Sequence, residues 1–157
     1  DGFYAQGLQF QADEVLALTE QTRTLLPNIC LSVTVPHILS LDKQVQLAEE
    51  LVQAGADIIQ TEGGTSSRPN SSGTLGLIEK ASPTLAATHE ISRAISIPVL
   101  CASGLSDVTV PLAIASGAAG VGVGSYINQL NSEVAMVAAV RSLRESITLA
   151  NKSNIIA

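Results

Sequence analysis

Residues 98–125 read PVLCASGLSDVTVPLAIASGAAGVGVGS, and this stretch decides the fold. It contains two short apolar segments, 98–102 and 119–123, of the kind that forms strands buried in a parallel sheet. Each segment ends in a glycine-rich turn, and a helix is expected between them near residues 108–116. A strand, a crossover helix and a second strand in this order predict a β/α/β unit with parallel strands and a right-handed connection.

The same alternation of helix and strand continues upstream to the start of the chain. Apolar side chains recur every three or four residues where helices are expected, and β-branched runs predict the strands. Ser82 and Pro83 predict the start of the third helix, since serine is a good N-cap and proline suits the first helical turn. The expected elements are a helix at 12–26, a strand at 29–35, a helix at 41–54, a strand at 57–62, a helix at 83–95, the unit at 98–123, and a last helix with Met136, Val140, Leu143 and Ile147 on one face.

This pattern predicts an α/β fold: a parallel (β/α) barrel of the TIM type, present here as a C-terminal portion of about four strands. The chain has 157 residues, whereas a complete barrel takes roughly 250. We expect residues 1–150 to form the partial barrel and residues 151–157 to be a frayed C-terminal tail. A doubly wound sheet shows the same alternation, but its GxGxxG turn follows the first strand, and Gly120, Gly122 and Gly124 come too late for it.

Composition excludes several classes of function. The chain is 46% hydrophobic and 14% charged, so it is globular rather than disordered. A net charge of -6 excludes nucleic acid as an expected partner, because such binding needs a dense basic face. No apolar run reaches the roughly 18 residues that span a bilayer, so no membrane partner is expected. Cys30 and Cys101 are far apart and form no CxxC motif, so no metal site is predicted.

The last two expected strands end in turns that suit a phosphate group. Ser103 and Gly104 follow one strand, and Gly122, Gly124 and Ser125 end the other. In barrels of this type a phosphate is often held by main-chain N–H groups after the last two strands, and glycine lets the ligand approach the backbone. The plainer interpretation is that the glycines make tight turns and the serines cap helices. Agreement between two neighbouring turns favours the phosphate site.

Catalytic groups in a barrel project from the same ends of the strands. Glu62 is the strongest candidate, because burial beside Gly63 would suit a carboxylate for general acid/base catalysis. Alternatively, Glu62 binds loop backbone or Arg68. His37 is a second catalytic candidate, although it follows Pro36 directly and could be an ordinary loop residue. The residues expected to line the substrate pocket are Thr34, Gln60, Thr61, Gly63 and Gly64.

Five stretches resemble one known family closely. They are FYAQG at 3–7, LSVTVPH at 31–37, GADIIQTEGGTS at 55–66, PVLCASGLSD at 98–107 and GAAGVGVGS at 117–125. The chain is similar over nearly its whole length, to about residue 144, to the plastid and cyanobacterial proteins called hypothetical chloroplast reading frame twenty-three. The resemblance implies a TIM-type barrel whose first four or so strands are missing here, and a place in the chloroplast stroma or the cyanobacterial cytoplasm. The family has no established reaction, so it names no catalytic residue.

Two functions remain open from the sequence. One is an enzyme, such as a lyase, isomerase or synthase, that acts on a small phosphorylated metabolite and uses Glu62 for proton transfer. The other is a non-catalytic regulatory or scaffold protein that binds a phosphometabolite or flavin mononucleotide (FMN). No cofactor is identified, and FMN is left open as one. Association into a homo-oligomer is also left open, because a four-strand piece exposes strand edges that a closed barrel hides.

Overall fold

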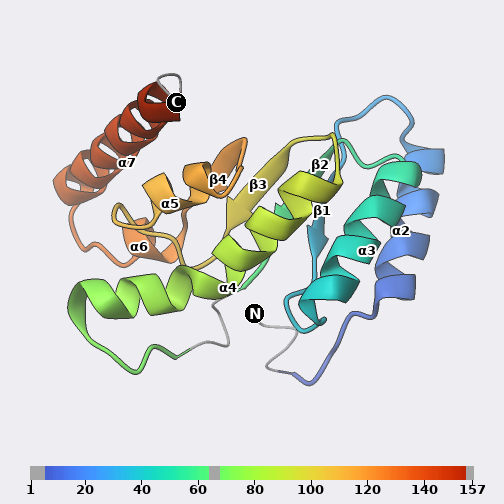
Figure 1. Cartoon of the computed structure of the whole chain (residues 1–157), viewed down its shortest axis with the longest axis horizontal. Helices are drawn as coiled ribbons and strands as arrows, with labels where there is room; N and C mark the ends of the chain where they lie inside the picture. Colours follow the sequence, from blue (N-terminus) through green and yellow to red (C-terminus); the bar gives the residue numbers. More distant parts are fainter. Residues whose placement is uncertain (1–5, 64–67, 155–157) are drawn as a thin grey trace.

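A computed structural model of the chain describes residues 6–63 and 68–154. Helices and strands alternate along it, as the sequence predicted (Figure 1). The elements are α2 (Ala12–Leu25), β1 (Ser32–Val35), α3 (Leu41–Gln53), β2 (Ile58–Thr61), α4 (Gly73–Ala94), β3 (Val99–Ala102), α5 (Val110–Ala115), β4 (Gly120–Gly122), α6 (Ser125–Asn128) and α7 (Glu133–Asn154). Within the described residues, no helix has both the length and the apolar character that crossing a lipid bilayer requires.

The four strands form one parallel sheet in the order β1-β2-β3-β4, so each strand pairs with its neighbour in sequence. The register places Thr34, Gln60, Leu100 and Gly120 in one row across all four strands. The predicted α/β class and its parallel sheet of about four strands are therefore confirmed, and the TIM-type barrel stays a prediction.

Helices pack on one face of this sheet. Successive side chains of a strand point to opposite faces, so every second residue of each strand faces these helices. Val35, Ile59 and Val99 point toward the helices and are almost fully buried. They form a core with α3 and α4, and a second core joins β3 to α5 and α7. On the opposite face Thr34 is exposed and Gln60 is half-buried. No described helix packs on this second face.

The expected start of the third helix at Pro83 is wrong. The helix, α4, begins ten residues earlier at Gly73, and Pro83 lies inside it. Proline has no N–H for the preceding turn and disturbs a helix at that point, and Figure 1 shows α4 changing direction along its length. The Ser82 hydroxyl donates to the Ile78 carbonyl at 2.8 Å instead of capping a new helix. The sequence signals for a helix start therefore mark a bend.

The packed face of the last helix differs from expectation. Leu143 is buried as expected, but Val140 is 50% exposed, so the packed face is rotated away from it. Helix α7 spans Glu133–Asn154, and the division into a partial barrel at 1–150 and a frayed tail at 151–157 stays a prediction.

Candidate functional site

The candidate site lies at the edge of the sheet where the four parallel strands end. We call this the carboxyl edge; it comprises residues 36–37, 62–63, 103–104 and 123–125, which directly follow β1 to β4. Because all four strands run in the same direction, these segments lie along one side of the sheet. Ligands of parallel α/β folds bind outside this end of the strands.

The two residues predicted to be catalytic contact each other at the carboxyl edge. His37 follows β1 and Glu62 follows β2, and His37 Nδ1 lies 2.9 Å from Glu62 Oε2. The main-chain N–H of His37 donates to the same carboxylate oxygen at 3.3 Å. The side chains are only 10% and 19% exposed. Arg68, which the sequence offered as a partner for Glu62, forms no ion pair with it in the part of the chain that the structure describes.

The carboxylate orients the imidazole. A carboxylate oxygen accepts hydrogen bonds, so Nδ1 carries the proton that points to Glu62, and this bond sets the orientation of the His37 ring. The second bond, from the His37 amide, holds the carboxylate from the main chain and so limits its rotation. A histidine oriented in this way by a carboxylate is an arrangement suited to general acid/base catalysis.

The residues predicted to line the pocket divide between the two faces of the sheet. Thr34 and Gln60 are paired in the register and point to the face without described helices. Thr61 points the other way, into a buried cluster of hydroxyl groups. Its Oγ1 lies 2.7 Å from that of Thr84 and 3.2 Å from that of Thr88, and it accepts a hydrogen bond from the Ala102 amide at 3.3 Å.

This hydroxyl cluster joins α4 to the sheet, and it was not predicted from the sequence. Thr84 also donates to the carbonyl of Ala102 at 2.6 Å. Thr84 and Thr88 are one helical turn apart on α4, a spacing that could have drawn attention to them, although threonine is common in helices without such a role. The cluster satisfies the polar groups where β2 and β3 meet the bend of α4.

Gly63 is a buried packing position. A Cβ atom there would lie 3.0 Å from the Thr84 amide nitrogen and 3.2 Å from Pro83 Cβ, so only glycine fits against the bend of α4 without a shift. Gly64, the other glycine expected in the pocket, lies outside the described residues.

The turn after β3 has an unusual backbone. Ser103 has a φ of 77°, the only positive value of a non-glycine residue in the described ranges, and Gly104 follows with 74°. A left-handed conformation costs an L-residue roughly 1–2 kcal/mol. Gly104 also packs tightly, because a Cβ atom there would lie 2.8 Å from the Lys80 carbonyl oxygen. Its conformation and its packing both require glycine.

The turn after β4 is more open. A Cβ atom on Gly124 would meet nothing within 4 Å, whereas one on Gly122 would lie 3.0 Å from Ala102 Cβ. Ser125 is exposed and begins the four-residue helix α6, and its hydroxyl caps no helix. Within the described residues, neither the Gly104 nor the Gly124 amide donates to a main-chain acceptor.

A tyrosine and an aspartate link these two turns, and the sequence did not single them out. Asp107 lies in the loop after β3, and Tyr126 lies in α6 after β4. Partial burial of Tyr126 and a hydrogen bond to the Asp107 carboxylate raise the pKa of its hydroxyl above the usual value. The pair therefore ties the β3 loop to α6.

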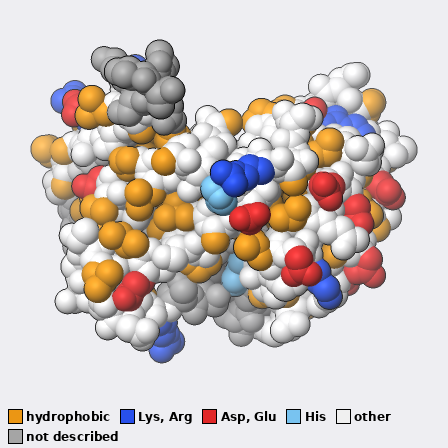
Figure 2. Space-filling model, in the orientation of Figure 1, with side chains coloured by type: hydrophobic (Ala, Val, Ile, Leu, Met, Phe, Trp, Pro, Cys, Tyr) orange, Lys and Arg blue, Asp and Glu red, His pale blue; other side chains and the backbone are white. Residues whose placement is uncertain are grey.

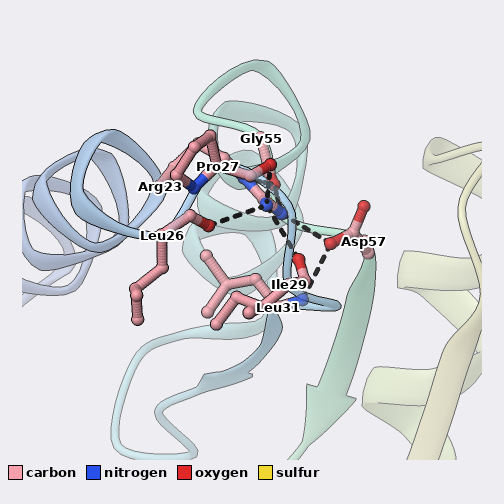
Figure 3. A network of polar contacts seen from close by, with 7 residues as sticks. All are labelled: Arg23, Leu26, Pro27, Ile29, Leu31, Gly55 and Asp57. Atoms are coloured by element: carbon pink, nitrogen blue, oxygen red, sulfur yellow. Dashed lines mark hydrogen bonds and ion pairs between the residues drawn. The ribbon is translucent and has the colours of Figure 1, made fainter.

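We call the opposite edge of the sheet, where the strands begin, the amino edge. A second polar cluster lies there, and it consists of Arg23, Ile29, Leu31, Gly55 and Asp57 (Figure 3). Arg23 donates to the carbonyl oxygens of Gly55 at 2.6 and 2.9 Å and of Ile29 at 2.8 Å, and pairs with Asp57. The Leu31 amide, and then Arg23, hold the pKa of Asp57 below its ordinary value.

Comparison with known proteins identifies the family. The family described as a protein of unknown function (DUF561) matches residues 1–153. The chain belongs to this family. It is 39% identical over 148 residues to the uncharacterized protein ycf23 of Porphyra purpurea, covering 94% of this chain and 56% of the relative. It is 40% identical over 160 residues to the ycf23 protein of Cyanophora paradoxa, covering 99% and 63%.

These matches confirm the family resemblance seen in the sequence, and they confirm a plastid or cyanobacterial setting, since the relatives are plastid-encoded. The chain spans little more than half the length of these members of the DUF561 family. Among solved structures it is similar to a chain of the Amycolatopsis orientalis BexX/CysO complex, with a TM-score of 0.63 and 15% identity over 89% of this chain and 49% of that one. At that identity the likeness shows the fold alone.

Proposed function

We propose that the carboxyl edge binds a small phosphorylated metabolite and that the chain is part of a TIM-type barrel enzyme, a lyase, isomerase or synthase. One observation carries the proposal: four consecutive parallel strands end side by side, two of them in a contacting histidine and glutamate and two in glycine turns. In α/β barrels this is the edge at which substrates bind.

The strand order supports a barrel over a doubly wound sheet. A doubly wound sheet reverses its order at a switch point and carries helices on both faces. The four described strands keep their sequence order, and the described helices pack on one face. A barrel would enclose the other face, which carries the row Thr34, Gln60, Leu100 and Gly120.

The proposal assigns binding and chemistry to different strands. The turns at Ser103–Gly104 and Gly122–Ser125 would donate main-chain N–H groups to the phosphate, which the open space around Gly124 allows. His37 would transfer the proton and Glu62 would orient it. Adjacent strands are about 4.8 Å apart, so the ends of β1 and β3 are roughly 10 Å apart, and a phosphorylated metabolite of several carbon atoms would extend from the Gly104 turn to His37.

A thermal-shift screen tests binding. The protein is heated with inorganic phosphate, a series of sugar phosphates, pyridoxal phosphate and FMN, because a ligand that binds the native state raises the unfolding midpoint. We expect a sugar phosphate to raise it and inorganic phosphate to compete. The absence of a shift with all of these compounds would refute the proposed site.

Two variants then separate an enzyme from a binding protein. In Glu62→Gln and His37→Asn we expect the bound ligand to be retained and turnover to fall about 10²- to 10⁴-fold, the usual contribution of general acid/base catalysis. Glu49→Gln, an exposed glutamate on α3, is the matched control. Ligand binding without turnover in the unmodified protein would instead favour a regulatory or scaffold role, with FMN among the ligands to test.

A further inference from the structure

The hydroxyl cluster of Thr61, Thr84 and Thr88 ends at the turn that follows β3. The three side chains are at most 1% exposed, and each hydroxyl has one proton to donate. Thr84 donates its proton to the Ala102 carbonyl at 2.6 Å, so the 2.7 Å contact between Thr61 and Thr84 is donated by Thr61. The proton of Thr61 is then used, and the 3.2 Å contact with Thr88 is donated by Thr88. The three bonds therefore run in one direction and end at the Ala102 carbonyl.

The cluster holds both polar main-chain groups of Ala102, the last residue of β3. The Ala102 N–H donates to Thr61 Oγ1 at 3.3 Å, and the Ala102 carbonyl accepts from Thr84. Pairing of β3 with β2 ends at Leu100, so at Ala102 threonine hydroxyls take the place of main-chain partners. In a trans peptide the C=O and the following N–H point in opposite directions. The bond to Thr84 therefore turns the Ser103 N–H away from α4.

Helix α4 also packs against the residue on the other side of Ser103. A Cβ atom on Gly104 would lie 2.8 Å from the Lys80 carbonyl oxygen, and Lys80 precedes Thr84 by about one helical turn. Between these two contacts Ser103 has its φ of 77°, the one positive value of a non-glycine residue in the described ranges. A strained backbone persists only where the surrounding structure holds it, and such residues gather at ligand sites. The contacts with α4 on both sides explain why Ser103 keeps this conformation.

Main-chain groups are important for anion binding here because basic side chains are sparse. The chain carries a net charge of -6, and on the face shown in Figure 2 the described Lys and Arg side chains lie apart from one another. An anion bound to such a protein depends on main-chain N–H groups, whose directions are set by the peptide planes. Within the described residues, the Ser103 and Gly104 amides donate to no main-chain acceptor. Both N–H groups are therefore available to a ligand.

We propose that Thr84 is a positioning residue of the proposed phosphate site. Its hydroxyl holds the Ala102 carbonyl toward α4; in this way it keeps Ser103 in the left-handed conformation and directs the Ser103 N–H to the ligand. Thr88 supports this bond only through Thr61, because it makes no hydrogen bond to Ala102 in the described structure. The ligand part of this inference rests on the proposed function, whereas the control of the Ser103 backbone does not.

Three variants test the role of this hydroxyl in phosphate binding. Thr84→Val keeps the shape of the side chain and removes the hydroxyl, whereas Thr84→Ser keeps the hydroxyl. Thr88→Val is the matched control, because it removes an equally buried hydroxyl one helical turn away. Isothermal titration calorimetry with inorganic phosphate measures the dissociation constant. We expect Thr84→Val to raise it about tenfold or more, and Thr84→Ser and Thr88→Val to change it by less than about threefold.

Amide signals of the ligand-free protein test the backbone directly. In proton–nitrogen correlation spectra we expect the Ser103 and Gly104 signals to move in Thr84→Val and to keep their positions in Thr88→Val, with Thr84→Ser close to the unmodified protein. Thr84→Cys serves as a second variant if Thr84→Val does not fold, because a thiol is a weaker donor of similar size. It should shift the same two signals by a smaller amount and weaken phosphate binding about threefold.

Several outcomes would overturn the proposal. One is that Thr84→Val, or Thr84→Cys in its place, leaves the Ser103 and Gly104 signals unchanged. Another is that Thr84→Ser is impaired as strongly as Thr84→Val. An equal loss of affinity in Thr88→Val would also overturn it, because the cluster would then act only through overall stability. If the unmodified protein binds no phosphate, the proposed function fails, and the amide signals still decide whether Thr84 sets the turn.

Discussion

The two edges of the sheet each carry an acidic and a basic side chain in contact, but in different settings. At the amino edge, Arg23 uses its guanidinium group on main-chain carbonyls of several segments as well as on Asp57. At the carboxyl edge, His37 and Glu62 bond to each other beside glycine turns. An arginine that bonds to the main chain of several segments stabilises the fold, whereas an oriented histidine at strand ends is suited to acid/base catalysis. The position of each pair in the fold therefore distinguishes Arg23–Asp57, which is structural, from His37–Glu62, which is a candidate for function.

The largest effect expected within this comparison concerns the two glycine turns. Gly104→Ala should lower the free energy of unfolding by about 3 kcal/mol, because it combines a left-handed φ with a Cβ atom 2.8 Å from the Lys80 carbonyl. Gly124→Ala should change it by less than about 0.5 kcal/mol, since φ is -111° and the space is open. Urea denaturation measures both. Equal losses in the two variants would mean that the turns do not differ as described.

A second test compares the two charged pairs. Arg23→Ala should cost about 2 kcal/mol, because it leaves several carbonyl oxygens and Asp57 without their donor. Arg23→Lys should recover only part of this, since lysine lacks the planar fork that reaches several acceptors. Glu62→Gln should cost less than about 1 kcal/mol, because an amide oxygen still accepts a hydrogen bond. If Glu62→Gln were the more destabilising change, the carboxyl-edge pair would be primarily structural.

Acid should weaken the amino edge. The Leu31 amide and Arg23 lower the pKa of Asp57, so the unfolded chain binds its proton more tightly than the folded chain. The stabilisation that ionised Asp57 contributes is complete when the pH is well above the ordinary aspartate pKa of about 4. It is lost as the pH falls through the lowered pKa of Asp57 in the folded chain. Asp57→Asn should be less stable than the unmodified protein at pH 7, with the difference shrinking toward pH 3. Thermal midpoints measured across this range would show parallel curves if Asp57 were not involved.

The smallest effect is a gain. Ser103→Gly should raise the free energy of unfolding by up to about 1 kcal/mol, because glycine adopts the left-handed conformation without steric cost. If the Ser103 turn holds a phosphate, the same variant should bind a sugar phosphate less tightly, as judged by the thermal shift. Tighter ligand binding in Ser103→Gly would argue against a role for this residue in the site.

The sequence predicted the elements well where periodicity was strong. Helix α3, Leu41–Gln53, agrees closely with the helix predicted at 41–54. The prediction failed at Pro83, because a serine–proline pair usually starts a helix but here lies inside α4. The Asn70 and Ser71 amides and the Ser71 hydroxyl bond to Glu79, and this contact holds the loop against the start of α4. Such a contact between residues eight and nine positions apart cannot be recognised from local preferences.

The candidate site was predicted in part. The sequence named His37 and Glu62 separately, because both follow expected strands, but their contact depends on the pairing of β1 with β2. It grouped Thr61 with Thr34 and Gln60, although Thr61 points into the hydroxyl cluster on the helix side. It offered no reason to choose Arg23, whose acceptors lie up to 34 positions away.

The sequence alone determined that helices and parallel strands alternate, which residues follow each strand, and that the chain belongs to its family, because these properties depend on local periodicity and on identity along the chain. The tertiary structure decided which strand ends meet, which side of the sheet each side chain occupies, and which glycines are needed for packing. Those features depend on register and on contacts between distant residues, and no single segment contains that information.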